Sequence, residues 1–172
     1  MANIIPILSE KQISEIPSRA EQKVYKSLEG QLSNDCLVIH SLEFIKQTSK
    51  YKGHGDREAD FVIFSPRLGV LVVEVKGGGI EYDKSIRKWY SIDRNNKKYE
   101  IKNPAQQAKD AKYEIRSHLK QKMGHKNILF AHAVLFPDID NATPLSSPDI
   151  PINIIGTNRN LISLDKWVSD IF

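Results

Sequence analysis

Two apolar runs joined by a short turn constrain the fold of this chain more than any other feature. Residues 59–78 read ADFVIFSPRLGVLVVEVKGG. Each run has the length and the β-branched or aromatic content of a buried strand. The segment SPRLG between them contains proline and glycine, which favour turns. We therefore predict an antiparallel β-hairpin over these residues.

The register of this hairpin brings charged residues together. If the hairpin is symmetric about Arg67, Asp60 on the first strand lies directly opposite Glu74 on the second. Directly opposed side chains have Cβ atoms about 4.5 to 5.5 Å apart, and like charges at that separation destabilise a sheet. A divalent cation between the two carboxylates would make the contact favourable. Lys76 follows on the same face, and we predict that the three side chains form a functional site.

Such a site suits Mg²⁺ or Mn²⁺, which bind oxygen ligands. The expected ligands are Asp60, Glu74 and the backbone carbonyl of Val75. The ammonium of Lys76 could orient or help to deprotonate a metal-bound water, or neutralise charge on a phosphate. These residues therefore predict hydrolysis of phosphodiester bonds. A plain Glu–Lys ion pair at an exposed strand end is the alternative.

The remaining sequence predicts helices and strands on both sides of the hairpin. Ser18 and Asn103 have the side chains of helix N-caps. We expect helices over residues 17–32, 103–123 and 161–172, strands over 35–46, 128–136 and 152–156, short antiparallel strands within 79–101, and a loop over 49–58. This order predicts an α/β sandwich around a mixed sheet. One domain is expected over residues 18–172, after an N-terminal tail over residues 1–17.

Positive charge is concentrated in one part of the chain. Residues 84–126 contain thirteen Lys and Arg but four Asp and Glu, whereas the whole chain has a net charge of +4. A cationic segment suits a polyanion such as nucleic acid. The predicted nucleic-acid contacts are Arg57, Lys84, Arg87, Lys88, Lys97, Lys98 and Lys102. Alternatively, these side chains only solvate a helix and a hairpin.

Aromatic residues within the basic segment allow two interpretations. Trp89 and Tyr90 could stack on an unpaired base, or they could belong to the core of the sheet. The five histidines show no zinc-like spacing, and His132 lies within an apolar run, where a core position is expected.

Cysteine content and hydropathy bear on the compartment. Cys36 is the sole cysteine, which excludes a disulfide within the chain and a cysteine-rich zinc site. A reducing compartment fits this content, and we expect the cytoplasm. No run approaches the roughly 20 apolar residues that a membrane-spanning helix needs, so no membrane association is expected.

The segment GDREADFVIFSPRLGVLVVEVKGG, followed by KNPAQQA, resembles the nuclease-related domain, a branch of the PD-(D/E)XK restriction-endonuclease-like superfamily. The resemblance extends from about Glu21 to Gln107. It implies a restriction-endonuclease-like mixed β-sheet flanked by helices. It also implies a Mg²⁺-dependent DNA nuclease centre at Asp60, Glu74 and Lys76. The superfamily's proline before the aspartate is replaced here by Ala59.

The resemblance assigns roles to two further residues. Glu21 matches an additional acid that many superfamily members contribute, and Gln107 would touch the site or the substrate. Each has an alternative: Glu21 could close a capping box with Ser18, and Gln107 could be a half-buried glutamine bonded to backbone. Glu58 lies opposite Lys76 in the predicted register, as a salt-bridge partner or an auxiliary acid.

The sequence thus predicts a metal-dependent nuclease domain acting on DNA, in DNA processing or repair. RNA is not excluded as a substrate. The alternative is a non-catalytic nucleic-acid-binding or interaction domain that keeps the nuclease fold. Family members are often fused to helicase, kinase or zinc-ribbon modules, so the chain could be part of a larger helicase-type protein. A homodimer is expected if both strands of a duplex are cut together.

Overall fold

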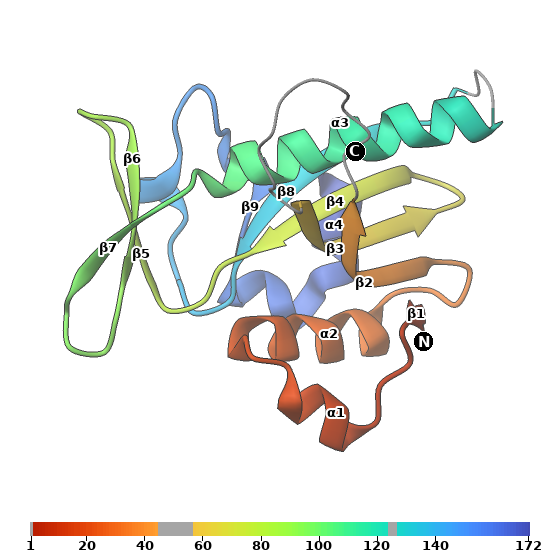
Figure 1. Ribbon diagram of the computed structural model, residues 1–172, viewed down its shortest axis with the longest axis horizontal. Helices are drawn as coiled ribbons and strands as arrows, with labels where there is room; N and C mark the ends of the chain where they lie inside the picture. The colour runs from red at the N-terminus through yellow and green to blue at the C-terminus, as the bar shows by residue number, and fades with distance from the viewer. Residues whose placement is uncertain (1, 45–56, 124–126) are drawn as a thin grey trace.

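The computed structural model describes residues 2–44, 57–123 and 127–172 (Figure 1). Within these ranges a mixed sheet has the strand order β1-β2-β3-β4-β8-β9, and a smaller antiparallel sheet has the order β5-β6-β7. The strands are β1 (Asn3–Ile5), β2 (Leu37–Phe44), β3 (Arg57–Ser65), β4 (Gly69–Val75), β5 (Gly79–Asp83), β6 (Lys88–Ile92), β7 (Lys98–Ile101), β8 (Phe130–Phe136) and β9 (Ile155–Thr157).

Helices cover both faces of the larger sheet (Figure 1). The α-helices are α1 (Glu10–Glu15), α2 (Arg19–Gln31), α3 (Pro104–Met123) and α4 (Leu164–Asp170), and the 3₁₀ helices are η1 (Thr143–Leu145), η2 (Ile152–Ile154) and η3 (Asn158–Ser163). Helices α2 and α4 pack on one face of the sheet, and α3 packs on the other. The predicted mixed sheet flanked by helices is confirmed. No helix in the described ranges is long and apolar enough to cross a membrane.

The β3–β4 hairpin has the predicted register. Ser65 pairs with Gly69, and Phe61 pairs with Val73. Gly69 has a φ of +125°, and a Cβ there would lie 2.4 Å from the backbone oxygen of Leu129, so only glycine fits this position. The positive φ of Gly69 and its close contact with Leu129 fix the turn. The turn in turn determines which residues of the two strands oppose each other.

Both faces of β4 are buried, which explains its continuous apolar run. The side chains of Leu71, Val73 and Val75 lie in the cluster under α2 and α4. Those of Val70 and Val72 lie under α3. The strand is therefore central, and a charged residue near its end is held in a largely apolar setting.

Strand β3 switches faces at Asp60. In a regular strand, residues two apart share a face. Phe61 packs in the cluster under α2, but Ala59 packs in the cluster under α3. The intervening Asp60 is therefore at a local break in the pleat.

The neighbouring strand β2 breaks at the matching position. Its ladder with β3 includes His40 and Leu42 but skips Ser41, which would lie opposite Asp60. Ser41 has a φ of +54°, in the left-handed region that residues other than glycine rarely adopt. Two adjacent strands thus change faces together, and the break surrounds Asp60.

The N-terminal segment is part of the folded core, so the expected tail over residues 1–17 is wrong. Strand β1 pairs in parallel with β2, and Ser9 forms a capping box with Gln12 at the start of α1. Ile4 and Ile13 are buried. The parallel pairing with β2 and the hydrogen bond from the Leu8 N–H to the hydroxyl of Tyr25 on α2 hold this segment in the core.

The smaller sheet stands to one side of the larger one (Figure 1). Its Trp89 is 1% exposed and stacks on Tyr82, with ring centroids 4.6 Å apart, and on Phe136, with centroids 6.0 Å apart. Trp89 is therefore a core residue and is not available to stack on a base. Tyr90 is half-buried. The loop predicted over residues 49–58 lies largely outside the described residues.

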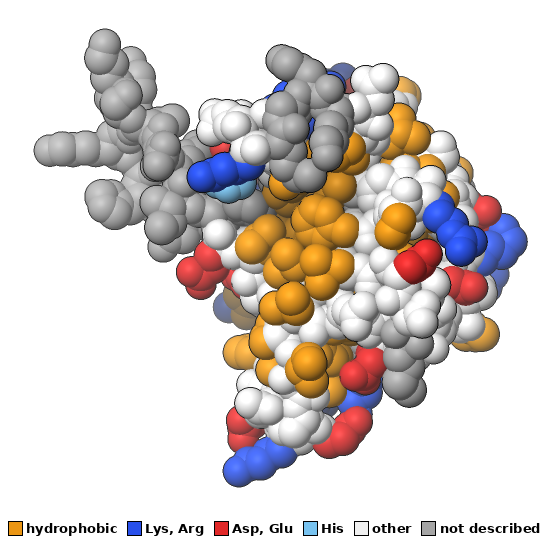
Figure 2. All heavy atoms as spheres, turned by 90° about the vertical axis from the view of Figure 1, so that its right-hand side faces the viewer, with side chains coloured by type: hydrophobic (Ala, Val, Ile, Leu, Met, Phe, Trp, Pro, Cys, Tyr) orange, Lys and Arg blue, Asp and Glu red, His pale blue; other side chains and the backbone are white. Residues whose placement is uncertain are grey.

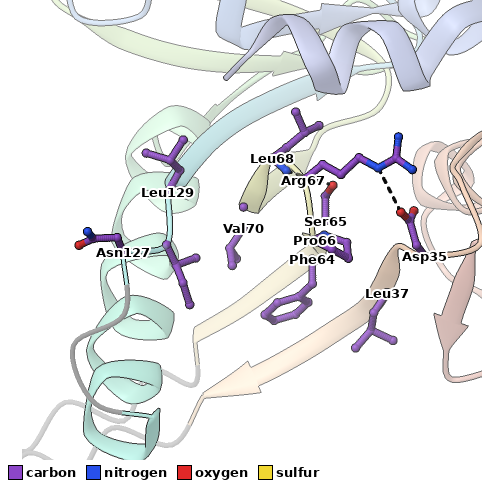
Figure 3. Close-up of a pocket in the computed structure, with 12 residues that line it drawn as sticks. Asp35, Leu37, Phe64, Ser65, Pro66, Arg67, Leu68, Val70, Asn127 and Leu129 are labelled. Atoms are coloured by element: carbon purple, nitrogen blue, oxygen red, sulfur yellow. Dashed lines mark hydrogen bonds and ion pairs between the residues drawn. The ribbon is translucent and has the colours of Figure 1, made fainter.

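The turn of the hairpin borders a mostly apolar pocket (Figure 3). Phe64, Leu68 and Leu129 are among its lining residues, and Arg67 at its rim lies 3.5 Å from the carboxylate of Asp35. Hydrophobic side chains also form a patch on the face seen from the right-hand side of Figure 1 (Figure 2). The pocket is at the opposite end of the hairpin from Asp60, so it is separate from the predicted site.

Candidate active site

The carboxylate of Asp60 lies where β3 and β4 separate. The ladder between these strands ends at the pair Phe61–Val73. Beyond that pair, the N–H of Val75 donates a 2.7 Å hydrogen bond to Asp60 Oδ2. A side-chain oxygen thus replaces the backbone carbonyl that a continuing ladder would supply, and it holds Asp60 at the end of β4.

Glu74 and Lys76 form an ion pair at the same end of β4. Glu74 is 3% exposed, and its Oε1 lies 2.5 Å from Nζ of Lys76, whose side chain is 29% exposed. The backbone N–H of Lys76 donates to the carbonyl of Leu135, which fixes its place beside β8. The alternative of an exposed pair at a strand end does not describe this buried arrangement.

The protonation of both acids reflects their burial. Lys76 forms an ion pair with Glu74, and its charge also acts on Asp60. Burial, followed by the charge of Glu74, raises the pKa of Asp60 to about 7, although Lys76 and the Val75 N–H oppose the rise. Burial also raises the pKa of Glu74, against the effect of Lys76. Burial would lower the pKa of Lys76, but the charges of both acids outweigh burial and raise it. Burial thus disfavours negative charge on both acids, despite the nearby ammonium.

Glu21 lies in the first turn of α2 near these acids. Its N–H donates to Oγ of Ser18, which is the cap expected from the sequence. Its carboxylate does not complete the capping box but lies 3.2 Å from Nε2 of His40. After burial, the charge of Glu21 contributes to the raised pKa values of Asp60 and Glu74. The structure thus brings Glu21 toward the predicted pair.

His40 is a site residue that the sequence analysis did not identify. It is 7% exposed and packs between the rings of Tyr25 and Phe61, with centroid distances of 5.7 and 4.8 Å. Its Nε2 also lies 3.4 Å from Oγ of Ser41. The pairing of β2 with β3 places His40 beside the break at Asp60, and a single strand read by itself does not reveal that neighbour.

The segment after Lys76 is held by Asp138, which the sequence analysis also missed. Oδ2 of Asp138 accepts a 2.8 Å hydrogen bond from the N–H of Gly78, and Oδ1 pairs with Nζ of Lys23 on α2. Burial would raise the pKa of Asp138, but the Gly78 N–H and Lys23 together lower it. A Cβ on Gly77 would lie 2.9 Å from Cβ of Ala20, so this segment passes close to the start of α2.

Gln107 does not contact the acids through a hydrogen bond. Asn103 caps α3 as predicted, since its Oδ1 accepts from the N–H of Gln106 at 3.2 Å. The N–H of Gln107 donates to the Asn103 carbonyl, as in any helix, and the side chain is half-buried. Its amide forms no hydrogen bond with a described residue, so the expected contact with site or substrate stays a prediction.

The predicted nucleic-acid contacts differ in how far their charges are compensated. Lys88 and Lys98 each form a 2.7 Å ion pair across the smaller sheet, with Glu100 and Glu81. The ammonium of Lys97 lies 5.1 Å from the centroid of the Tyr99 ring. Three others, Lys84, Arg87 and Lys102, are exposed. The side chain of Arg57 lies outside the described part of the structure.

The oxygen ligands predicted for a divalent cation fit that role. Hydrogen bonds with described residues occupy Oδ2 of Asp60 and Oε1 of Glu74, and each carboxylate keeps its other oxygen. Mg²⁺ is commonly held by one or two carboxylates, with waters and substrate phosphate completing its shell. Within the described ranges, no group of three His, Cys, Asp or Glu side chains is placed to hold a metal ion.

A mixed sheet flanked by helices, with two acids and a lysine where its central strands separate, defines a nuclease-like α/β domain. The family model for the nuclease-related domain matches residues 16–137. The chain belongs to this family, as its resemblance predicted. Neither the curated proteins nor the solved structures contain a match to the chain.

Proposed function

We propose that this domain is a divalent-cation-dependent nuclease that hydrolyses phosphodiester bonds in DNA, in DNA processing or repair. The observation that supports it is the buried Glu74, paired with Lys76, whose charge acts on the half-buried Asp60. Glu74 is 3% exposed, and the pKa of Asp60 is raised to about 7 by burial and by Glu74. Such an arrangement is unfavourable without a further cation, and pKa shifts of this kind are typical of functional sites.

Asp60, Glu74 and the carbonyl of Val75 would hold Mg²⁺ or Mn²⁺. When bound, the ion would polarise a phosphate oxygen and lower the pKa of a bound water. The chain's own contribution is to hold these oxygens in place. The Val75 N–H fixes Asp60, and the ammonium of Lys76 fixes Glu74.

Lys76 acts as a cation, not as a base. A general base works best when its pKa lies near the working pH. The charges of Glu74 and Asp60 raise the pKa of Lys76 above its ordinary value despite burial, so the side chain stays protonated. Its role is therefore to orient the attacking water and to stabilise negative charge that develops on the phosphate.

Cleavage assays on matched variants test this proposal. Purified protein is incubated with plasmid, single-stranded DNA and RNA, with Mg²⁺, Mn²⁺ or EDTA. Asp60→Ala and Lys76→Ala are expected to lower the rate by at least about 100-fold, the usual loss when a charge-stabilising group is removed. The controls Lys166→Ala and Asp170→Ala break a 2.5 Å ion pair that is exposed on α4, and they should retain activity.

Cleavage that survives both Asp60→Ala and Lys76→Ala would contradict the proposal. Cleavage of RNA alone would keep the mechanism and change the substrate.

A non-catalytic nucleic-acid-binding domain is the second candidate. It is favoured by the lack, within the described ranges, of a set of three metal-ligating side chains. Titration calorimetry with Mn²⁺ separates the two functions. Heat of binding that disappears in Asp60→Ala supports the nuclease, whereas no metal binding even with DNA present supports the second candidate.

A further inference from the structure

Four cationic side chains form a row along α3, here called the α3 stripe: Lys109, Lys112, Arg116 and Lys120. Their spacing of three, four and four residues places them on one side of the helix. Lys109, Arg116 and Lys120 are exposed, and Lys112 is half-buried. By the same spacing, the acids Asp110 and Glu114 fall outside the row.

Lys112 is held in the stripe by a neutral partner. Its Nζ lies 3.2 Å from Nδ1 of His132 on β8 and 4.7 Å from the ring centroid of Tyr113. Burial, together with Lys112 and Lys109, lowers the pKa of His132 to about 4, so the imidazole is neutral and accepts from the ammonium. The contact positions Lys112 without cancelling its charge.

The charges of the stripe are not compensated within the described part of the chain. None of the ion pairs between described residues includes Lys109, Lys112, Arg116 or Lys120. Burial and the charges of Lys109 and Arg116 lower the pKa of Lys112. In contrast, Lys88 and Lys98 on the smaller sheet have carboxylate partners. A polyanion therefore meets less competition from carboxylates at the stripe than at Lys88 and Lys98.

The stripe begins close to the candidate active site. Ala105, in the first turn of α3, packs in one cluster with Val134, which is the register partner of Glu74 on β8. Lys109 lies four residues further along the helix. From Lys109 to Lys120 the helix rises about 16 Å, at roughly 1.5 Å per residue. A row of that length spans several phosphates of one strand, which advance about 3.4 Å each in a duplex.

We propose that the α3 stripe binds the phosphodiester backbone of the nucleic acid that reaches Asp60 and Glu74. Lys112 is the anchored member of the row, and His132 is its positioning residue. Lysine contacts phosphates as a point charge and carries no sequence information, so the stripe sets affinity and orientation. The inference rests on the proposed function, because it takes nucleic acid as the substrate.

Two variants that remove equal charge test the proposal. The first is Lys109→Gln/Lys112→Gln/Arg116→Gln, and the second, on the smaller sheet, is Lys88→Gln/Lys97→Gln/Lys98→Gln. Both are made in an Asp60→Asn background. Fluorescence anisotropy in EDTA follows the binding of a labelled 20-mer, duplex or single-stranded, from 50 to 300 mM KCl. Binding is thus measured without cleavage.

The α3 variant should weaken binding at least about tenfold and reduce the slope of log K against log salt by about 2 to 3, since each phosphate contact contributes about 0.9. The smaller-sheet variant should weaken binding less than about threefold. The double variant Lys109→Gln/Arg116→Gln changes only exposed side chains, so it should not disturb the fold. It should show about two thirds of the slope change.

Equal losses of affinity in the two triple variants would mean that net charge alone explains the binding, and would overturn the proposal. A larger loss in the smaller-sheet variant, or no binding by the parent protein, would also overturn it. Cleavage is measured separately on the wild-type background. An α3 variant that binds normally while Asp60→Ala abolishes cleavage would reject the stripe and leave the nuclease standing.

Discussion

Nε2 of His40 lies 3.2 Å from Oε2 of Glu21, and this contact connects β2 to the first turn of α2 beside the two acids. His40 is buried between Tyr25 and Phe61, so its ring has little freedom to move. A carboxylate in the first turn of a helix has several rotamers open to it. The buried imidazole selects the one that faces the acids, and we infer that His40 positions Glu21.

A double-mutant cycle tests this link. Glu21→Gln and His40→Phe should each weaken Mn²⁺ binding by about three- to tenfold, and phenylalanine keeps the ring packing of His40. If His40 acts through Glu21, the double variant binds Mn²⁺ no more weakly than Glu21→Gln alone. Titration calorimetry measures the affinities, and thermal melts check the fold. Additive losses would mean that the two side chains act independently.

Removing Lys76 should lower the free energy of unfolding, because Glu74 is buried beside it. Lys76→Met leaves Glu74 at 3% exposure without its ion-pair partner. Breaking a buried pair from one side usually costs about 3 to 5 kcal/mol, and the partial exposure of Lys76 lowers the expected loss to about 2 to 3 kcal/mol. Urea unfolding in EDTA measures this free energy.

The matched variant Glu74→Gln/Lys76→Met removes both charges and should lie within about 1 kcal/mol of the wild type. If the double variant were as unstable as the single one, lost packing and not the unpaired charge would explain the effect.

Gly77 should tolerate no side chain, because of its contact with α2. A Cβ there would lie 2.9 Å from Cβ of Ala20 and 3.3 Å from Oδ2 of Asp138. Gly77→Ala is expected to destabilise the protein by about 1 to 3 kcal/mol. It should also lower the cleavage rate, since Lys76 is the preceding residue.

Gly30 provides the control for this substitution. It lies in α2, and a Cβ there would have no atom within 4 Å. Gly30→Ala should stabilise the protein by about 0.5 to 1 kcal/mol, because alanine is the better helix former. Thermal and urea unfolding compare the two variants. Equal changes in stability for Gly77→Ala and Gly30→Ala would contradict the steric explanation for Gly77.

The hairpin was predictable because it depends on local rules. A period of two, a turn containing proline and glycine, and the symmetry about Arg67 together predict the register, which the ladder follows as far as Phe61 and Val73. Asp60 and Glu74 lie beyond the last pair of this ladder. The ion pair of Lys76 follows from the same alternation. Lys76 nevertheless pairs with Glu74, not with Glu58, because the ladder ends before Glu58 could come opposite it.

The other parts of the site depend on contacts between distant segments. The face switch requires Ser41 to adopt a φ of +54°, which no residue pattern indicates. His40 becomes a site residue only through the pairing of β2 with β3. Trp89 illustrates the same limit, since its stacking on Tyr82 and Phe136 joins two sheets. Patterns along one segment carry no information about such neighbours.

His132 should make stability depend on pH in the acid range. Burial, then Lys112 and Lys109, lowers its pKa from 6.5 to about 4 in the folded protein. Between these two values the unfolded chain binds a proton that the folded protein does not. Stability from this group is therefore complete above pH 6.5 and is lost as the pH falls toward 4.

The expected loss is on the order of 2 kcal/mol, after a discount for partial exposure to solvent. Urea unfolding at pH 7.5, 6.0 and 5.0 should show a steeper decline for the wild type than for His132→Gln, in which nothing titrates at that position. His118→Gln, on the exposed side of α3, should follow the wild type. The comparison isolates His132, because each variant differs from the wild type by a single histidine. Parallel curves for His132→Gln and the wild type would show that folding does not lower the pKa of His132, which would contradict its burial beside the ammonium of Lys112.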